Sequence, residues 1–333
     1  MTLFRRLTTA ALLLCSVVVV FGAYVRLSDA GLGCPDWPGC YGQLTVPTEA
    51  EHVERAQQSF PERPVEHAKA WKEMIHRYLA STLGLLIVGL ALLSLRAGMP
   101  RVLPRVLLLL VIFQGLLGMW TVTWLLKPLA VTAHLLGGMA TLALLFWLWL
   151  GTRESPSFGR KRESSALPTP GRPGIRPVAG LALALLAGQI FLGGWTSSNY
   201  AALACPDLPT CQGRLWPELD AGEAFTLWRG LEQSYEYGVL DNRARVTIHH
   251  LHRVGALTVT VLFVALGAWL WRQGGAWRRD GLLILAALAL QVAIGLGLIV
   301  LQLPLVLAAA HNAGAALLLL AVTRLNHRAW EQG

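Results

Sequence analysis

Apolar residues in this chain fall into eight runs of about 20 residues, separated by polar segments. An α-helix needs about 20 apolar residues to cross roughly 30 Å of hydrocarbon. Only helices and closed barrels satisfy their backbone polar groups in lipid, and runs of this length predict helices. The expected spans are residues 7–25, 75–95, 106–126, 129–150, 178–198, 248–271, 281–301 and 305–325. The pattern therefore predicts an all-α membrane protein with eight transmembrane helices.

Charged residues indicate how these helices are oriented. Two long connections, residues 28–72 and 199–247, each carry seven Asp or Glu against four Lys or Arg. The other connections and the two ends are basic, which places them in the cytoplasm. We therefore expect a multi-pass protein of the bacterial inner membrane, with both termini cytoplasmic and the long loops periplasmic.

Composition supports a membrane protein and argues against two other classes. Of 333 residues, 54% are hydrophobic and 14% are charged, whereas soluble domains carry about 25% charged residues. The net charge of +9 is divided among loops and forms no single basic patch, so membrane lipid is expected as a partner and nucleic acid is not. Residues 7–25 exceed the apolar core of a typical signal peptide, so we expect a retained helix in which Cys15 is a buried apolar residue.

The chain contains an internal repeat. The pattern C-P-D-x-P-x-C-x-G occurs at residues 34–42 and again at 205–213, and His-Arg pairs occur at 76–77 and 252–253. A glutamine precedes a histidine by 20 residues in both parts, as Gln114 with His134 and Gln291 with His311. We predict two four-helix bundles, residues 1–154 and 178–333, joined by a cytoplasmic linker at 155–177. A pseudo-twofold axis along the membrane normal is expected to relate them.

Four histidines lie near the outer ends of even-numbered spans, at matched depth: His76, His134, His252 and His311. Ionisable residues inside spans are costly and are functional candidates. Two imidazoles facing each other across each bundle are suited to bind a haem iron from both sides. A single histidine would more often be a helix-packing hydrogen bonder, but four in repeat register favour metal or haem, and few accompanying carboxylates or thiols disfavour zinc.

Other residues near the four histidines are candidates for binding a haem. Gly137, Gly255 and Gly314 each follow a histidine by three residues and are expected to admit a flat macrocycle. Guanidinium groups pair with carboxylates such as haem propionates. His249 lies one turn before His252 and is expected to orient that ligand or a propionate. The proposed propionate contacts are Arg26, Arg77 and Arg253, and the glutamines are expected to be packing residues.

The repeat is broken at one position. Glu73 lies one turn before His76, and His249 is at the equivalent place before His252. Glu73 is suited to stabilise positive charge or to move protons beside a haem, although capping the helix or pairing with Lys69 or Lys72 is an equally simple role. The difference predicts one reactive site and one electron-transfer site.

Two cysteine pairs, Cys34 with Cys40 and Cys205 with Cys211, lie in the outer loops, where oxidising conditions favour disulfides. Each pair is expected to staple its loop above the histidines. A redox-active dithiol that passes electrons is the alternative.

With duplicated four-helix halves, four outer-level histidines, an E-x-x-H-R motif and two outer cysteine pairs, the chain resembles the haem A synthase family over residues 7–327. The resemblance implies oxidation of a ring methyl of haem O to a formyl group. It places haem O in the first half with Glu73, His76 and His134, and a haem B cofactor in the second half with His252 and His311. Haem O synthase and cytochrome c oxidase assembly factors are the implied partners, and a homo-oligomer is left open.

Two other functions fit parts of the pattern. A non-catalytic dihaem b-type electron carrier would use the same histidines, but gives Glu73 no role. A periplasmic-facing thiol oxidase would use the two cysteine pairs, but gives no reason for four histidines in register.

Overall fold

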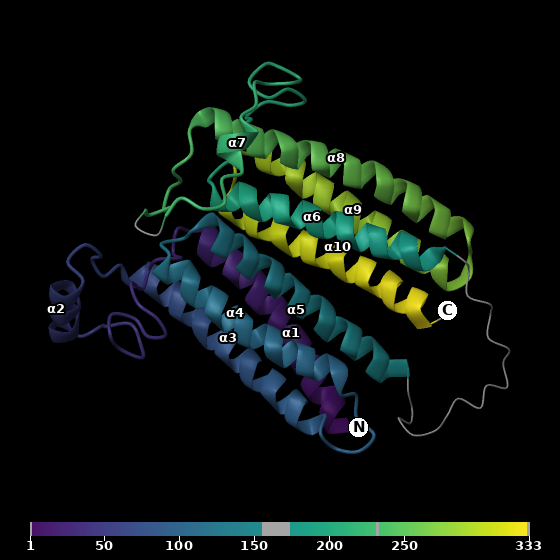
Figure 1. The fold of residues 1–333 in the computed structure, drawn as a ribbon, viewed down its shortest axis with the longest axis horizontal. Coiled ribbons are helices and arrows are strands. Elements are labelled where there is room, and N and C mark those ends of the chain that lie inside the picture. Colours follow the sequence, from purple (N-terminus) through teal and green to yellow (C-terminus); the bar gives the residue numbers. More distant parts are fainter. Residues whose placement is uncertain (1, 155–173, 231–232, 332–333) are drawn as a thin grey trace.

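The structure, a computed structural model, describes residues 2–154, 174–230 and 233–331, and these residues form ten helices. Figure 1 shows the long helices side by side, with the N- and C-terminal ends at one end of the molecule and α2 and α7 at the other. The helices are α1 (Thr2–Leu27), α2 (Ala50–Ser59), α3 (His67–Leu93), α4 (Val102–Thr123), α5 (Pro128–Glu154), α6 (Ile175–Ser198), α7 (Ala221–Ala224), α8 (Asn242–Arg272), α9 (Gly275–Val300) and α10 (Leu305–Glu331).

Eight of these helices are long and apolar enough to cross a membrane, which confirms the predicted all-α membrane protein. Helix α3 begins eight residues before the predicted span and α8 six residues before it. Hydropathy marks only the part that lies in lipid, whereas a helix continues into water as long as its backbone bonds are satisfied. The Asp241 side chain provides this for α8 by accepting a hydrogen bond from the Ala244 N–H at 2.7 Å.

The helices contact one another in two groups of four. Helices α1, α3, α4 and α5 form one closed ring of contacts, and α6, α8, α9 and α10 form the other. The groups meet where α1 and α5 contact α10 and where α5 contacts α6 (Figure 1). The pseudo-twofold relation stays a prediction. Residues 155–173 of the expected linker lie outside the described residues, and residues 175–177, also expected as linker, are instead the first residues of α6.

Large apolar side chains cover the outside of the helices. Leu109, Val300 and Val306 are 69–79% exposed, which is costly in water over a whole surface but favourable against lipid tails. Cys15, as expected, lies inside the first group of helices as a buried free thiol.

Helices α8 and α9 approach each other closely at paired glycines. A Cβ atom on Gly281 would lie 2.7 Å from the carbonyl oxygen of Gly267 and 3.1 Å from the Trp271 amide nitrogen. These neighbours are backbone atoms, so no side chain can move to make room. Gly281 therefore sets the distance between the two helices.

We expect Gly281→Ala to lower the free energy of unfolding by about 1–3 kcal/mol, because the added methyl forces α8 and α9 apart. Thermal unfolding of the detergent-solubilised protein measures the effect. Gly84→Ala is the matched control, since a Cβ there meets nothing within 4 Å and alanine is the better helix former. Equal melting temperatures for the two variants would contradict the close contact.

Candidate functional site

The four predicted histidines are divided equally between the two groups of helices. His76 on α3 and His134 on α5 have ring centroids 6.5 Å apart with ring planes at 68°. His252 on α8 and His311 on α10 belong to the second group, and α6 and α9 each contact both of these helices. The structure therefore brings the first predicted pair together, and a contact between the other two rings stays a prediction.

A neighbouring helix presents a glycine to each imidazole. A Cβ atom on these glycines would lie within 3.4 Å of the ring: Gly22 on α1 for His76, Gly118 on α4 for His134, Gly193 on α6 for His252 and Gly295 on α9 for His311. Any larger residue would occupy the space that the rings need. The sequence carried a signal for these positions, because each of the last three follows a glutamine by four residues.

The glycines that were expected to admit a macrocycle have a different role. A Cβ on Gly137 would lie 2.8 Å from the Gln114 side chain, and one on Gly314 would lie 2.2 Å from Gln291 Oε1. These glycines thus admit glutamine side chains from the adjacent helix, and their expected contact with a macrocycle stays a prediction.

The first pair of imidazoles has a separation that suits a metal bound between the two rings. A metal bonded at about 2 Å to one nitrogen of each ring holds the ring centres roughly 6 Å apart, close to the observed separation of 6.5 Å. The Nδ1 atoms of His134 and His311 are buried without a hydrogen-bond partner. No three His, Cys, Asp or Glu residues gather as a metal site in the described part of the chain. A pair of imidazoles is the donor set that an iron porphyrin takes from a protein, because the porphyrin supplies four ligands itself and needs only two more.

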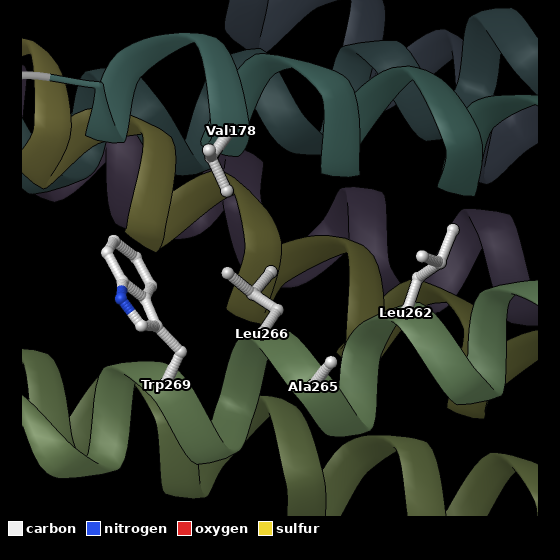
Figure 2. Close-up of a pocket in the computed structure, with 5 residues that line it drawn as sticks. All are labelled: Val178, Leu262, Ala265, Leu266 and Trp269. Carbon is white, nitrogen blue, oxygen red and sulfur yellow. The ribbon is translucent and has the colours of Figure 1, made fainter.

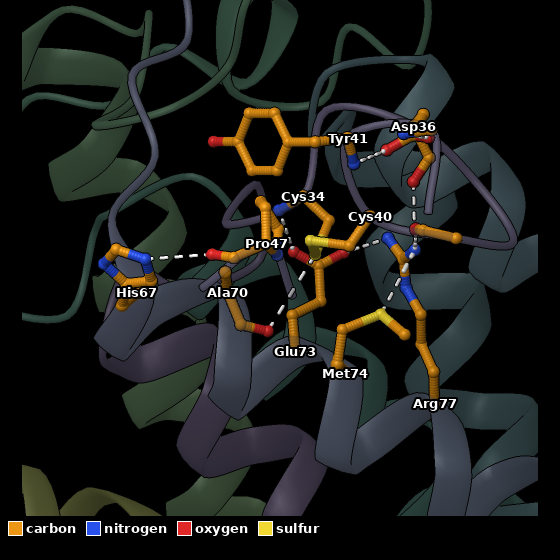
Figure 3. Close-up of a disulfide and its surroundings, with 12 residues drawn as sticks. Cys34, Asp36, Cys40, Tyr41, Pro47, His67, Ala70, Glu73, Met74 and Arg77 are labelled. Atoms are coloured by element: carbon orange, nitrogen blue, oxygen red, sulfur yellow. Dashed lines mark hydrogen bonds and ion pairs between the residues drawn. A yellow bond between two sulfur atoms is a disulfide. The ribbon is translucent and has the colours of Figure 1, made fainter. Parts of the chain in front are cut away.

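Glu73 is buried beneath the first cysteine loop, one turn before His76 (Figure 3). Its Oε2 accepts a hydrogen bond from the Cys34 N–H at 2.9 Å, and its Oε1 pairs with the Arg77 guanidinium. The pairing with Lys69 or Lys72 considered from the sequence is not what holds it. A buried carboxylate is thus fixed between a disulfide loop and a candidate ligand.

His249 occupies the same position in the second half. Its Nδ1 accepts a hydrogen bond from the Cys205 N–H at 3.2 Å, and its Nε2 lies 3.3 Å from Arg253 Nε. The structural equivalence of Glu73 and His249 therefore extends to their partners. Only the first half carries an acidic group there.

Both cysteine pairs form disulfides, Cys34–Cys40 and Cys205–Cys211, as predicted. The aspartate of the repeated motif closes each loop. Asp36 accepts hydrogen bonds from Tyr41 and Gly42 amides at 2.6 and 2.7 Å (Figure 3 shows the Tyr41 bond). Its counterpart, Asp207, bonds the corresponding amides in the same way. The motif thus encodes a closed loop, in which the final glycine has a positive φ in both copies.

Arginines anchor both loops to the helices. Arg77 donates to the carbonyl oxygens of Asp36 and Gly39, and Arg253 donates to those of Asp207 and Thr210. The sequence assigned these guanidiniums to haem propionates, which stays a prediction. Their anchoring role was missed because it depends on loop carbonyls, and every residue has a carbonyl.

Arg26 lies where the two groups of helices meet. It donates to the Ser197 carbonyl at 2.9 Å and to the Tyr200 hydroxyl at 3.1 Å, and its guanidinium lies over the Tyr200 ring. The Tyr200 hydroxyl also donates to Asp29 at 3.2 Å. The structure therefore shows Arg26 joining the halves, while its predicted propionate contact stays a prediction.

An apolar groove on the outer surface lies apart from these groups. Figure 2 shows Leu262, Ala265, Leu266 and Trp269 of α8 with Val178 of α6. It has no ionisable side chain, so it offers lipid contact and no acid–base chemistry.

The chain is similar to known proteins over nearly its whole length. The COX15-CtaA family, described as cytochrome oxidase assembly protein, matches residues 5–323. A protein of Shewanella oneidensis named "Heme A synthase" is 46% identical over 95% of this chain and 93% of its own length. Proteins with the same printed name from Caulobacter vibrioides and Granulibacter bethesdensis are 30% and 26% identical. They cover 92% of this chain each, and 90% and 81% of their own lengths.

The Asp207 carboxylate gives the second loop a defined response to acid. Its pKa is lowered to about 2, first because the Thr210 hydroxyl hydrogen-bonds it and then because of the Gly213 and Gln212 amides. A lowered pKa stabilises the loop fully above the unfolded value near pH 4, and this stabilisation is lost as pH falls through about 2.

We expect the Cys205–Cys211 disulfide to resist reduction by a water-soluble phosphine equally well from neutral pH to about pH 4, and progressively less as the pH falls through about 2. Asp207→Ala should speed reduction several-fold already at neutral pH, because two loop amides lose their acceptor. The rate is measured by mass spectrometry after thiol alkylation. Glu218→Ala, which removes an exposed partner of Arg214, is the control, and equal rates in both variants would refute the closing role of Asp207.

Proposed function

Because this chain belongs to the COX15-CtaA family of cytochrome oxidase assembly proteins, we propose that it converts haem O into haem A by oxidising a ring methyl to a formyl group. The reaction is an oxidation within a membrane. Haem O carries a farnesyl chain and is soluble in lipid, and eight apolar helices provide a site that it reaches without leaving the bilayer.

The observation that carries this proposal is the difference between two otherwise matched histidine sites. Each half has a pair of imidazoles, a disulfide loop above it and an arginine that anchors the loop. Only the first half holds a buried carboxylate, Glu73, beside its histidine. A non-catalytic carrier of electrons gives this carboxylate no role, whereas an enzyme needs a reactive group at one of its sites.

We assign the substrate to the first half, with His76 and His134 as ligands of haem O. His252 and His311 would hold haem B in the second half. Haem B supplies one-electron redox chemistry when bound, and it would accept or relay electrons from the oxidation. The 6.5 Å separation of the first two rings and the glycine facing each of the four imidazoles support both assignments.

Glu73 is the residue we assign to catalysis. Oxidation of a methyl group releases protons at the edge of the ring, and a carboxylate fixed nearby takes them up. Arg77 and the Cys34 amide hold its two oxygens, so it does not rotate freely. Glu73 is only 5% exposed, so bulk water has little access to this base.

Location and partners follow from the same proposal. The protein spans the membrane several times, and we place it in the bacterial inner membrane with cytoplasmic termini and with the histidines toward the periplasmic side. Haem O synthase would supply its substrate, and factors that assemble cytochrome c oxidase would receive its product.

A dihaem electron carrier is the second candidate, since the same imidazole pairs would serve it. Its haem spectrum would be the same, but it would form no haem A from haem O. A thiol oxidase is distinguished by replacing the four loop cysteines with serine, which would abolish its activity while leaving haem chemistry at least partly intact.

We expect Glu73→Gln to keep bound haem and to lower haem A formation by about 10²–10⁴-fold, because the amide cannot accept a proton. Chromatography of extracted haems from cells that also express haem O synthase measures the product. Glu66→Gln, an exposed site at the start of the same helix, is the control.

Two outcomes would contradict the proposal. Wild-type protein that carries no haem under any preparation would show that the histidines do not form a haem site. Glu73→Gln protein that makes haem A at the wild-type rate would show that Glu73 is not catalytic.

A further inference from the structure

Glutamine side chains contact both imidazole rings of the second half. Gln189 Nε2 on α6 lies 3.0 Å from His252 Nδ1 and 3.0 Å from the His252 carbonyl oxygen. Gln291 Nε2 on α9 lies 3.2 Å from His311 Nε2. Each ring is thereby held by an amide from a neighbouring helix.

Neither imidazole of the first half has such a contact. Gln114 donates at 2.9 Å to the main-chain carbonyl of His134, and the Nδ1 atom of that ring has no partner. His76 bonds the main-chain carbonyl of Val18. Val18 precedes Gly22 by four residues as Gln189 precedes Gly193, so an apolar residue replaces the glutamine.

The glycine that makes room for Gln189 in the second half has no counterpart in the first half. A Cβ on Gly255 would lie 2.3 Å from Gln189 Oε1, so the glutamine fits only beside a residue without a side chain. Gly255 follows His252 by three residues, and the residue three after His76 is Leu79. Beside His76 the first half therefore lacks the amide and also the space for it. Beside His134 it keeps Gln114 and Gly137, but the amide bonds the main chain and leaves the ring without a contact.

A hydrogen bond on the second nitrogen of a metal-bound imidazole fixes the ring and raises its basicity, and losing that bond typically lowers metal affinity about 10–100-fold. An amide carries a donor and an acceptor, so it serves whichever ring nitrogen is left over after iron binds. The Oε1 atoms of Gln189 and Gln291 are buried without a partner, and each is available as an acceptor.

We propose that Gln189 and Gln291 are positioning residues that make the second half retain its haem, and that the first half, in which no glutamine amide contacts either ring, exchanges its haem. This inference rests on the proposed function, in which one haem is a resident cofactor and the other is a substrate that must leave as product. It goes further by naming the side chains that separate the two behaviours.

The test is the rate at which purified protein loses haem B to an excess of apomyoglobin. Gln189→Met and Gln291→Met keep the side-chain volume and remove the amide. Each should accelerate haem B loss about 10–100-fold, with a shift of the haem absorbance away from the low-spin form. Gln114→Met is the matched control from the first half and should leave haem B loss unchanged.

A gain-of-retention variant tests the other half. Val18→Gln combined with Leu79→Gly supplies both the amide and its space beside His76. Haem A should then copurify with the protein in a higher ratio to chain than in wild type. Circular dichroism and size-exclusion chromatography of every variant check the fold, and a variant that fails them is replaced by Gln189→Leu or Gln291→Leu.

The outcomes separate this inference from the proposed function. Unchanged haem B loss in both second-half variants, or equal acceleration in Gln114→Met, would overturn the inference while wild-type haem A formation stands. Wild-type protein that binds haem B but forms no haem A would overturn the function. Faster loss confined to the second-half variants would establish the positioning role.

Discussion

Hydrocarbon offers no hydrogen bonds, and this constraint organises the polar groups of the protein. A polar side chain at membrane depth must find its partner within the chain or bear the cost of desolvation. Amide, imidazole, carboxylate and guanidinium groups accordingly meet one another, as in the contacts of Gln189 with His252 and of Glu73 with Arg77. Glycines bring the helices close enough for these contacts, and apolar side chains face the lipid.

Duplication gives the protein two copies of one arrangement, and small departures from it give the copies different chemistry. Glu73 and His249 contact equivalent backbone amides and equivalent arginines, yet only one is an acid. Val18 and Gln189 stand at equivalent positions, yet only one contacts a ring through its side chain. In the function we propose, the same scaffold thereby holds a substrate in one half and a cofactor in the other.

The outer loops link the repeated motif to the histidines below. Each disulfide loop is closed by its aspartate and anchored by the arginine that follows a histidine. Glu73 or His249 then joins the first cysteine of the loop to the helix. A conformational change in a loop would therefore shift the histidine one turn away, because the residue that contacts the loop and that histidine lie on the same helix.

The sequence by itself determined the eight helices, the four histidines, the paired cysteines and the position where the repeat breaks. These features depend on the hydropathy of each segment and on the spacing of residues along the chain, and both can be read without knowing how the helices pack. Tertiary structure decided which side chains meet across helices. It shows that Gly137 makes room for a glutamine side chain, that Arg77 donates to loop carbonyls, and that Gln189 contacts an imidazole. Such contacts depend on the rotation and separation of packed helices, and a linear pattern carries neither quantity.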